Sequence, residues 1–101
     1  MAQHFNIIDQ LTQELLAAGD GVNVQSISLT NVHPTHSCYV DLYIEKTLTG
    51  RFYLLKKLEL PLGHTFIYEY TKFSNASGQF GLYIKLTKSA SETPEVDVII
   101  N

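Results

Sequence analysis

Two histidines stand three residues apart in His33-Pro34-Thr35-His36, a spacing that occurs in metal sites. A zinc ion in a protein needs three or four convergent side-chain ligands. The neighbouring Cys38 is assigned to the core below, and the first carboxylate after the histidines is Asp41. We therefore predict no metal site and expect both histidines to be solvated loop residues.

Carboxylates could serve as general acids and bases if two of them were held apart in one site. Asp41 and Glu45 share the outer face of one expected strand, and Glu59 and Glu69 lie on the outer faces of others. Exposed carboxylates of this kind usually keep a protein soluble. The sequence also has no Gly-x-Ser-x-Gly elbow and no glycine-rich phosphate loop. We expect no catalytic residues, no cofactor and no enzyme activity, with a small enzyme subunit kept as a distant alternative.

Tyrosines are the side chains best suited to make contacts. Four of them stand at odd-numbered positions, whereas the expected core residues stand at even-numbered ones. These four are Tyr39, Tyr43, Tyr53 and Tyr83. Tyrosines on a sheet stabilise cross-strand pairs, and they are also enriched at protein interfaces. A cluster of them could equally stack on sugar rings. These four are our candidate interface residues, on a face that also carries acidic and basic side chains.

Strands must position these residues, because apolar side chains alternate along the chain from Cys38 to the end. Successive side chains of a strand point to opposite faces, so this period marks a sheet with one buried face. Cys38 lies on that face, and we expect a buried, unreactive thiol. The apolar residues are Cys38, Val40, Leu42, Ile44, Phe52, Leu54, Leu58, Leu60, Phe66, Tyr68, Tyr70, Phe80, Leu82, Ile84, Leu86, Val96, Val98 and Ile100.

The expected strands are short and separated by turn sequences. They cover residues 22–31, 38–46, 51–60, 64–71, 79–88 and 95–100, and the linkers 47–50, 61–63 and 74–78 predict antiparallel neighbours. Within 22–31 the apolar phase changes, which predicts a β-bulge near Gln25 and Ser26. The fold prediction is an all-β, antiparallel β-sandwich, jelly-roll-like, with about eight short strands in one domain spanning residues 1–101.

The first 21 residues fit two structures. Apolar residues at helical spacing and good helix formers favour a helix over residues 5–18. Alternatively, residues 5–8 and 14–17 are strands, and Asp20-Gly21 is the tight turn of a hairpin leading into residues 22–31. The turn sequence favours the strand interpretation. Residues 1–21 then form a first hairpin or an N-terminal arm.

Composition and charge limit the kinds of molecule that we expect this chain to bind. The chain has 101 residues, a formal net charge of -3 and one cysteine, so no intrachain disulfide can form. Nucleic-acid binding needs clustered Lys and Arg, which an acidic chain of this kind lacks. No apolar run reaches the length of a membrane span, and the opening residues lack the basic start of a secretion signal. We expect neither nucleic acid nor membrane as a partner.

Residues 51–65 resemble a segment of small virion structural proteins of tailed bacteriophages. In that family a strand ends in an apolar-Pro-x-Gly-x-Thr turn, here Leu60-Pro61-Leu62-Gly63-His64-Thr65. Residues 24–31 are similar to a family strand that ends in Asn, followed by a loop and the Val-x-Leu-x-Ile strand at residues 40–44. Residues 73–84 and 96–100 also resemble family elements, so the similarity spans about residues 22–101.

This resemblance implies an antiparallel β-sandwich without a cofactor, made in the host cytoplasm and built into the virion as a capsid decoration or a neck- or tail-attached protein. The expected partners are further copies of the chain, as a homo-oligomer, and other virion proteins. The alternative is a carbohydrate-binding β-sandwich that uses the exposed tyrosines. The position in the particle, the symmetry, the copy number and the partner protein stay open.

Overall fold

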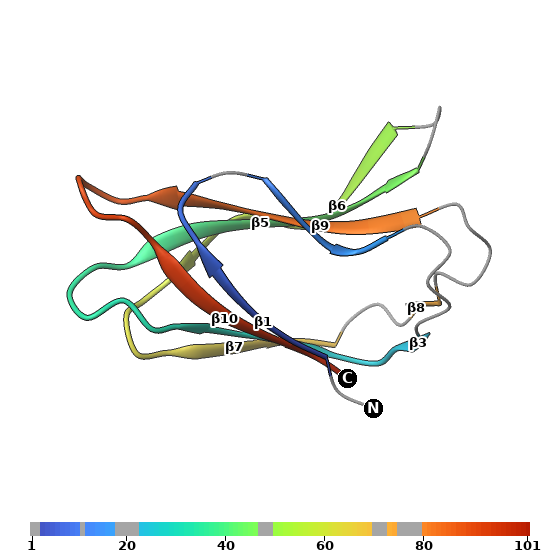
Figure 1. The fold of residues 1–101 in the computed structure, drawn as a ribbon, viewed down its shortest axis with the longest axis horizontal. Helices are drawn as coiled ribbons and strands as arrows, with labels where there is room; N and C mark the ends of the chain where they lie inside the picture. The colour runs from blue at the N-terminus through green and yellow to red at the C-terminus, as the bar shows by residue number, and fades with distance from the viewer. Residues whose placement is uncertain (1–2, 11, 18–22, 47–49, 70–72, 75–79) are drawn as a thin grey trace.

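The computed structural model describes residues 3–10, 12–17, 23–46, 50–69, 73–74 and 80–101, and its regular elements there are all strands (Figure 1). The predicted all-β sandwich is confirmed. The strands are β1 (Gln3–Ile8), β2 (Gln13–Leu16), β3 (Asn23–Val24), β4 (Ile27–Asn31), β5 (Cys38–Lys46), β6 (Gly50–Leu60), β7 (Thr65–Tyr68), β8 (Phe73–Ser74), β9 (Phe80–Lys88) and β10 (Glu95–Ile100).

Two four-stranded antiparallel sheets form the sandwich. Sheet A has the order β1-β10-β4-β7 and sheet B the order β2-β9-β5-β6, while β3 and β8 form a small separate pair. Each strand of the first half pairs with its mirror image in the second half: β1 with β10, β2 with β9, β3 with β8, β4 with β7 and β5 with β6. A long hairpin rolled into two layers in this way is a jelly roll. In Figure 1 sheet B is the upper layer and sheet A the lower one.

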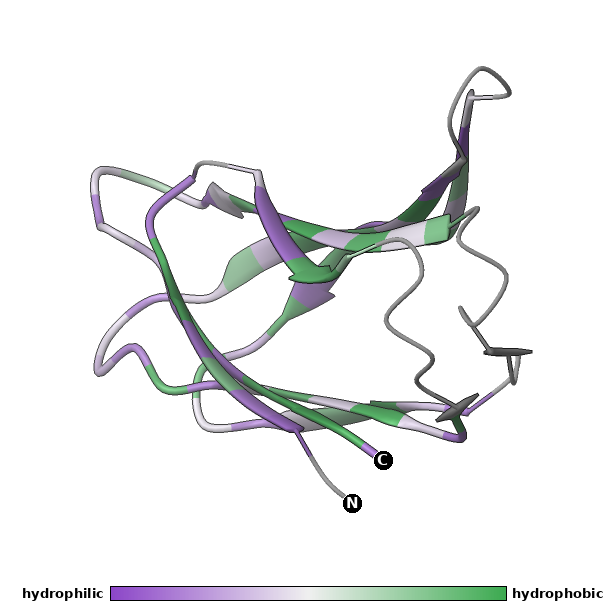
Figure 2. Cartoon of the chain, turned by 45° about the vertical axis from the view of Figure 1, so that its right-hand side comes forward, coloured by the Kyte–Doolittle hydropathy of each residue, from purple (hydrophilic) through white to green (hydrophobic). Residues whose placement is uncertain are grey.

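The core lies between the two sheets and follows the predicted alternation in β5, β9 and β10. Along these strands polar and apolar residues alternate (Figure 2), and the apolar inner side chains are almost fully buried, except Ile44 and Phe80, which are half-buried. Cys38 is one of them at 1% exposure, as predicted. Burial, and then the charge of Glu92, raises the pKa of its thiol to about 11. The thiol is therefore protonated and inert near neutral pH.

The predicted bulge at Gln25 and Ser26 is confirmed. The backbone N–H groups of both residues donate to the carbonyl of Asn101, at 2.6 and 3.1 Å. Two residues on one side therefore face one residue on the other, which is the definition of a bulge. The bulge lets even-numbered Val24 and odd-numbered Ile27 both reach the core.

In β6 the predicted alternation fails. The register with β5 slips twice, so Leu42 faces Leu55 where strict alternation expects an even-numbered partner. Lys57 has a positive φ of 53° at the first slip. The second slip restores the phase, but Phe52, predicted in the core, is 49% exposed. Phe52 pairs with Ile44 near the end of the β5–β6 hairpin, and this end of the hairpin turns away from sheet A in Figure 1.

Several predicted neighbours are wrong, although the strands themselves form. β1 and β2 replace the alternative helix over residues 5–18, but β2 pairs with β9 and not with residues 22–31. Asp20-Gly21 lies outside the described residues. The linker 61–63 crosses from sheet B to sheet A, and β7 and β9 lie in different sheets. A turn sequence marks where the chain reverses, and the layer that the next strand joins depends on long-range packing.

Asn31 ties the two layers together at the end of β4. It is the buried polar residue of the described chain, at 1% exposure. Its amide donates to the carbonyls of His36 (3.0 Å) and Leu60 (2.9 Å), and its side-chain oxygen accepts the N–H of His33 (2.9 Å). Its backbone carbonyl accepts the N–H of Gly63 at 3.0 Å. The Asn31 side chain thus holds the loop after β4 and the end of β6, and its backbone carbonyl holds the crossing turn.

Replacing Asn31 should therefore be costly. Asn31→Ala leaves the buried Leu60 carbonyl and the His33 N–H without their partners, and we expect a loss of about 3 kcal/mol in the free energy of unfolding. Urea denaturation followed by fluorescence measures it. Asn6→Ala is the matched control, because its amide bonds to Glu95 and Asp97 are exposed. Equal losses in the two variants would contradict the proposed role of Asn31.

Candidate interaction surface

Three of the four candidate tyrosines form one continuous row on the outer face of sheet B. Tyr43 of β5 lies directly opposite Tyr53 of β6 on one side and Tyr83 of β9 on the other. The ring centroids are 5.3 Å apart for Tyr43 and Tyr53, and 5.5 Å apart for the nearly parallel Tyr43 and Tyr83. We call Tyr53, Tyr43 and Tyr83 the tyrosine row.

The middle of the row is buried, which corrects the prediction that all four tyrosines are exposed. Tyr43 is 3% exposed although it lies outside the core cluster, whereas Tyr53 is 39% exposed. The guanidinium of Arg51 lies 4.3 Å from the centre of the Tyr43 ring and covers it together with the two flanking rings. Tyr53 is therefore the member of the row that can contact a partner most directly.

Close packing fixes the row. The Tyr83 ring rests on Gly81, where an added Cβ would lie 2.9 Å from the ring. A glycine inside a strand often marks such a close approach. The Tyr83 hydroxyl donates to Glu14 of β2 at 3.3 Å. Aromatic contact thus runs across three strands, and the hydrogen bond to Glu14 reaches the fourth.

Two cations that the sequence analysis missed surround the exposed end of the row. Arg51 pairs with Glu45 at 3.4 Å and donates to the Tyr53 hydroxyl at 3.4 Å. The ammonium of Lys56 lies 4.3 Å from the centre of the Tyr53 ring. The sequence did hold a signal for Arg51, which stands two residues before Tyr53 and hence on the same strand face. The position of Lys56 depends on the slips of β6 and could not be foreseen.

The two ends of the row differ in electrostatics. The hydrogen bond from Arg51, with Lys56 as a second cause, lowers the pKa of Tyr53 below its ordinary value. Burial, with the neighbouring Glu14 as a second cause, raises the pKa of Tyr83. The Tyr53 hydroxyl therefore lies in a cationic setting and that of Tyr83 in an anionic one.

Tyr39, the fourth candidate, lies apart from the row. It faces Thr87 of β9 and Glu59 of β6, four positions from Tyr43 along β5. With Lys57 and Thr87 it lines a hollow of about 360 Å³. The backbone N–H of Lys57 donates to Asp41 at 2.7 Å beside this hollow. The four candidates thus divide into a packed row and a single residue beside a hollow.

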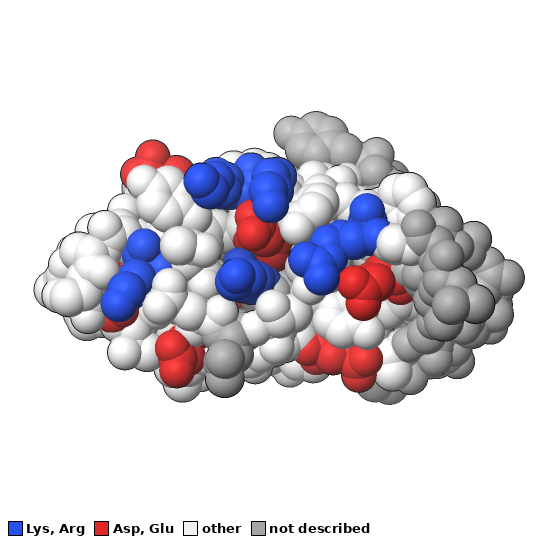
Figure 3. Space-filling view, turned by 90° about the horizontal axis from the view of Figure 1, so that it is seen from above, with Lys and Arg blue, Asp and Glu red and all other residues white. Residues whose placement is uncertain are grey.

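The face carries both signs of charge, as predicted. Figure 3 shows blue and red groups interspersed over sheet B, with the basic groups gathered near its middle. Asp41 stands opposite Lys85, and Glu45 opposite Arg51. The surface is therefore a mixed one, with an aromatic strip at one end.

The two loop histidines are half-buried and hydrogen-bonded, where solvated side chains were predicted. The His33 Nδ1 accepts the backbone N–H groups of Thr35 and His36, and the rings meet edge to face at 5.4 Å. They shape the loop after Asn31. Among the described residues, no three His, Cys, Asp or Glu side chains gather closely enough to hold a metal ion. That part of the chain also has no helix long and apolar enough to cross a membrane.

A mitogen of known structure shares the fold. The Yersinia pseudotuberculosis-derived mitogen superposes with a TM-score of 0.59 at 11% identity, over 100% of this chain and 85% of the mitogen. VP2 of infectious bursal disease virus, in its subviral particle, gives a TM-score of 0.44 at 13% identity, over 98% of this chain and 33% of VP2. No protein-family model and no curated protein matches the sequence. At such low identity the likeness to the mitogen establishes the fold alone.

The electrostatics of the row can be measured directly. Arg51→Gln removes the cation that stabilises the Tyr53 phenolate, so the pKa of Tyr53 should rise toward its ordinary value. NMR titration of isotope-labelled tyrosine, with Tyr53→Phe to assign the signal, measures the change. Lys88→Gln is the control, because Lys88 stands opposite Cys38 at the other end of β5. An unchanged pKa of Tyr53 in Arg51→Gln would show that the two side chains do not interact.

Proposed function

We propose that this chain is a non-enzymatic structural component of a tailed-phage virion, a capsid decoration or a neck- or tail-attached protein. It assembles through symmetric contacts with further copies of itself and binds other virion proteins. The tyrosine row is the contact surface. No catalytic step is assigned to any residue.

The observation that carries this proposal is the packed tyrosine row itself. Tyrosine and arginine are the residues that dominate binding energy at interfaces, and here they come pre-stacked on a rigid sheet. Because Tyr43 and Tyr83 are already held in place, binding through Tyr53 needs little further ordering of side chains. The resemblance of residues 22–101 to phage virion proteins supports the same proposal, and a jelly roll suits it.

Truncating the exposed end of the row should weaken assembly. Tyr53→Ala removes a ring that is 39% exposed, so the fold should survive while self-association falls at least tenfold. Sedimentation and light scattering measure the oligomer, and particles purified from infected cells show whether the chain is a virion component. Leu62→Ala is the control, an apolar side chain of similar exposure in the turn between β6 and β7. A chain that is monomeric at high concentration and absent from particles would refute the proposal.

A second candidate function rests on the hollow beside Tyr39. An aromatic side chain next to Lys57 and Thr87 offers a stacking surface and polar groups for a sugar hydroxyl. We propose carbohydrate binding there as the alternative. Glycan-array binding that Tyr39→Ala abolishes and Tyr53→Ala leaves intact would favour it. Silence of the wild-type chain across the array would rule it out.

A further inference from the structure

The outer face of sheet A carries a row of a different kind. Residues facing one another across its four strands form the neutral series His4, Ile99, Ser28 and Ile67. Ile67 is 55% exposed and Ile99 38% exposed, the first on an edge strand and the second on a central one. The two exposed isoleucines stand in one cross-strand row with Ser28 between them, and we call this row the Ile67–Ile99 strip.

The next row on this face is polar and internally bonded. Asn6 donates to Asp97 at 2.7 Å, and the hydroxyls of Thr30 and Thr65 lie 2.8 Å apart. Asp97 and Thr30 are themselves opposite one another. The polar row therefore frames the Ile67–Ile99 strip and leaves one carboxylate, that of Asp97, as the nearest charge.

The two sheets differ in charge. The four strands of sheet A contain Glu95 and Asp97 and no Lys or Arg. The four strands of sheet B contain six Lys or Arg residues and four acids, so their cations are in excess. Arg51 is paired with Glu45, and Lys56 lies over the exposed Tyr53 ring. The cations of sheet B complement the acids of sheet A.

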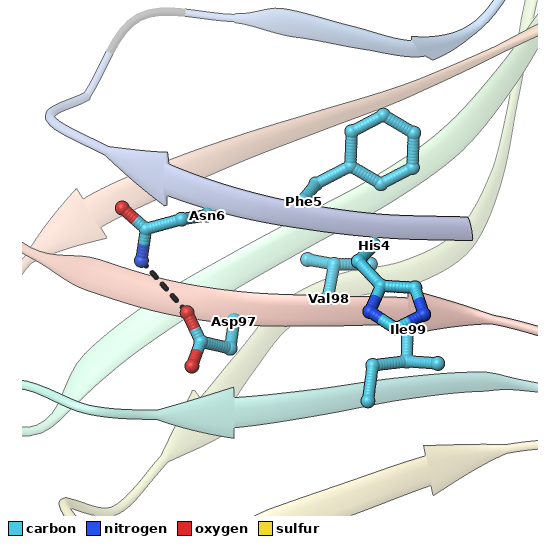
Figure 4. A pocket seen from close by; sticks show the side chains of 6 residues that line it. All are labelled: His4, Phe5, Asn6, Asp97, Val98 and Ile99. Atoms are coloured by element: carbon cyan, nitrogen blue, oxygen red, sulfur yellow. Dashed lines mark hydrogen bonds between the residues drawn. The ribbon is translucent and has the colours of Figure 1, made fainter. Parts of the chain in front are cut away.

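A hollow on sheet A lies beside the acidic residue Asp97. It has a volume of about 300 Å³ and is lined by His4, Phe5, Asn6, Asp97, Val98 and Ile99. Figure 4 shows His4 and Ile99 on one side of the two strands, Phe5 on the other, and Asn6 bonded to Asp97. A carboxylate beside the Ile99 side chain suits a lysine, whose stem is apolar and whose tip is charged. Lys56, beside the exposed Tyr53, is a side chain of that kind.

We propose that the outer face of sheet A binds the outer face of sheet B of a second copy of this chain. The Ile67–Ile99 strip packs against Tyr53, and Asp97 meets the cations around it. This inference rests on the proposed self-assembly and names the two surfaces that meet. The contact is heterologous, so repetition gives a ring or an open filament.

Charge disfavours a two-fold contact of sheet A with its own copy. If sheet A packed on its own copy about a two-fold axis, Glu95 and Asp97 of one chain would approach the same acids of the other, with no Lys or Arg in either set of strands. Like charges brought together at an interface are unfavourable. Packing sheet A on sheet B places those acids against Arg51 and Lys56.

Two complementary variants of the full chain test the contact. Ile67→Lys brings a cation to the Ile67–Ile99 strip and disables sheet A, while Tyr53→Glu brings an anion to the row and disables sheet B. Both side chains are exposed, so the unfolding midpoints should stay close to that of the wild type. Each variant alone should be a monomer in sedimentation experiments. An equimolar mixture should form a one-to-one dimer, since each variant retains the surface that the other has lost.

Other outcomes overturn the inference in distinguishable ways. Dimerisation of Tyr53→Glu alone would show that sheet A binds itself, and dimerisation of Ile67→Lys alone would show that sheet B does. Either result refutes the heterologous contact and leaves the structural role standing. A mixture that stays monomeric beside an oligomeric wild type places the contact elsewhere. A monomeric wild type contradicts both this inference and the proposed self-assembly.

Discussion

The pairing of residues from opposite ends of the chain is the constraint on which the rest of this structure depends. β10 lies between β1 and β4, and β9 lies between β2 and β5, so the last strands of the chain are central in both sheets. Their inner side chains, such as Val98 and Ile84, are fully buried. The N-terminal strands β1 and β2 are edges that have no partner in their sheets until the C-terminal strands arrive. Both sheets are therefore complete only when β9 and β10 have paired with the earlier strands. Long-range pairing of this kind makes folding slow.

The same constraint explains two of the places where the backbone departs from regular pairing. At one end, the carbonyl of Asn101 meets both Gln25 and Ser26, because the chain must pass from the β3–β8 pair into sheet A without losing the inward phase of its apolar residues. At the other end, β6 is an edge strand whose slips place Lys57 at a positive φ and leave Lys56 exposed. Bulges and lysines at an edge discourage pairing with foreign strands. The crossing turn after β6 is secured by Asn31, the buried polar hub of the described chain.

Sequence periodicity predicted the strands from Cys38 onward, the sandwich, the bulge at Gln25–Ser26 and the inert cysteine, because each of these depends on local phase. It could not predict that β2 pairs with β9, or that the turn at residues 61–63 changes sheets, because those outcomes depend on which surfaces remain to be covered. The tyrosines were also chosen from the alternation of the sequence, but alternation alone could not show that Tyr39 lies apart from the row. That separation comes from register: Tyr43 meets two tyrosines, whereas Tyr39 meets Thr87 and Glu59. Phe52 shows a further limit of predicting burial from periodicity. A side chain on the inner face of a strand is buried only where the other sheet covers it.

The inner faces of the two sheets form the core, so the outer faces can differ in their side chains and charges, and they do. Sheet B presents a rigid aromatic and cationic strip, in which Gly81 lets Tyr83 lie flat and Arg51 covers Tyr43. Sheet A presents isoleucines framed by bonded polar groups and two acids. A lone domain gains nothing in stability from an exposed Ile67, and Asp97, although bonded to Asn6, has no Lys or Arg beside it in the strands of sheet A. Both features become favourable when a second surface with aromatic rings and cations covers them, because burial removes apolar area from water and pairs the charges together. The chain itself carries such a surface on its opposite face, which is the arrangement that head-to-tail assembly requires.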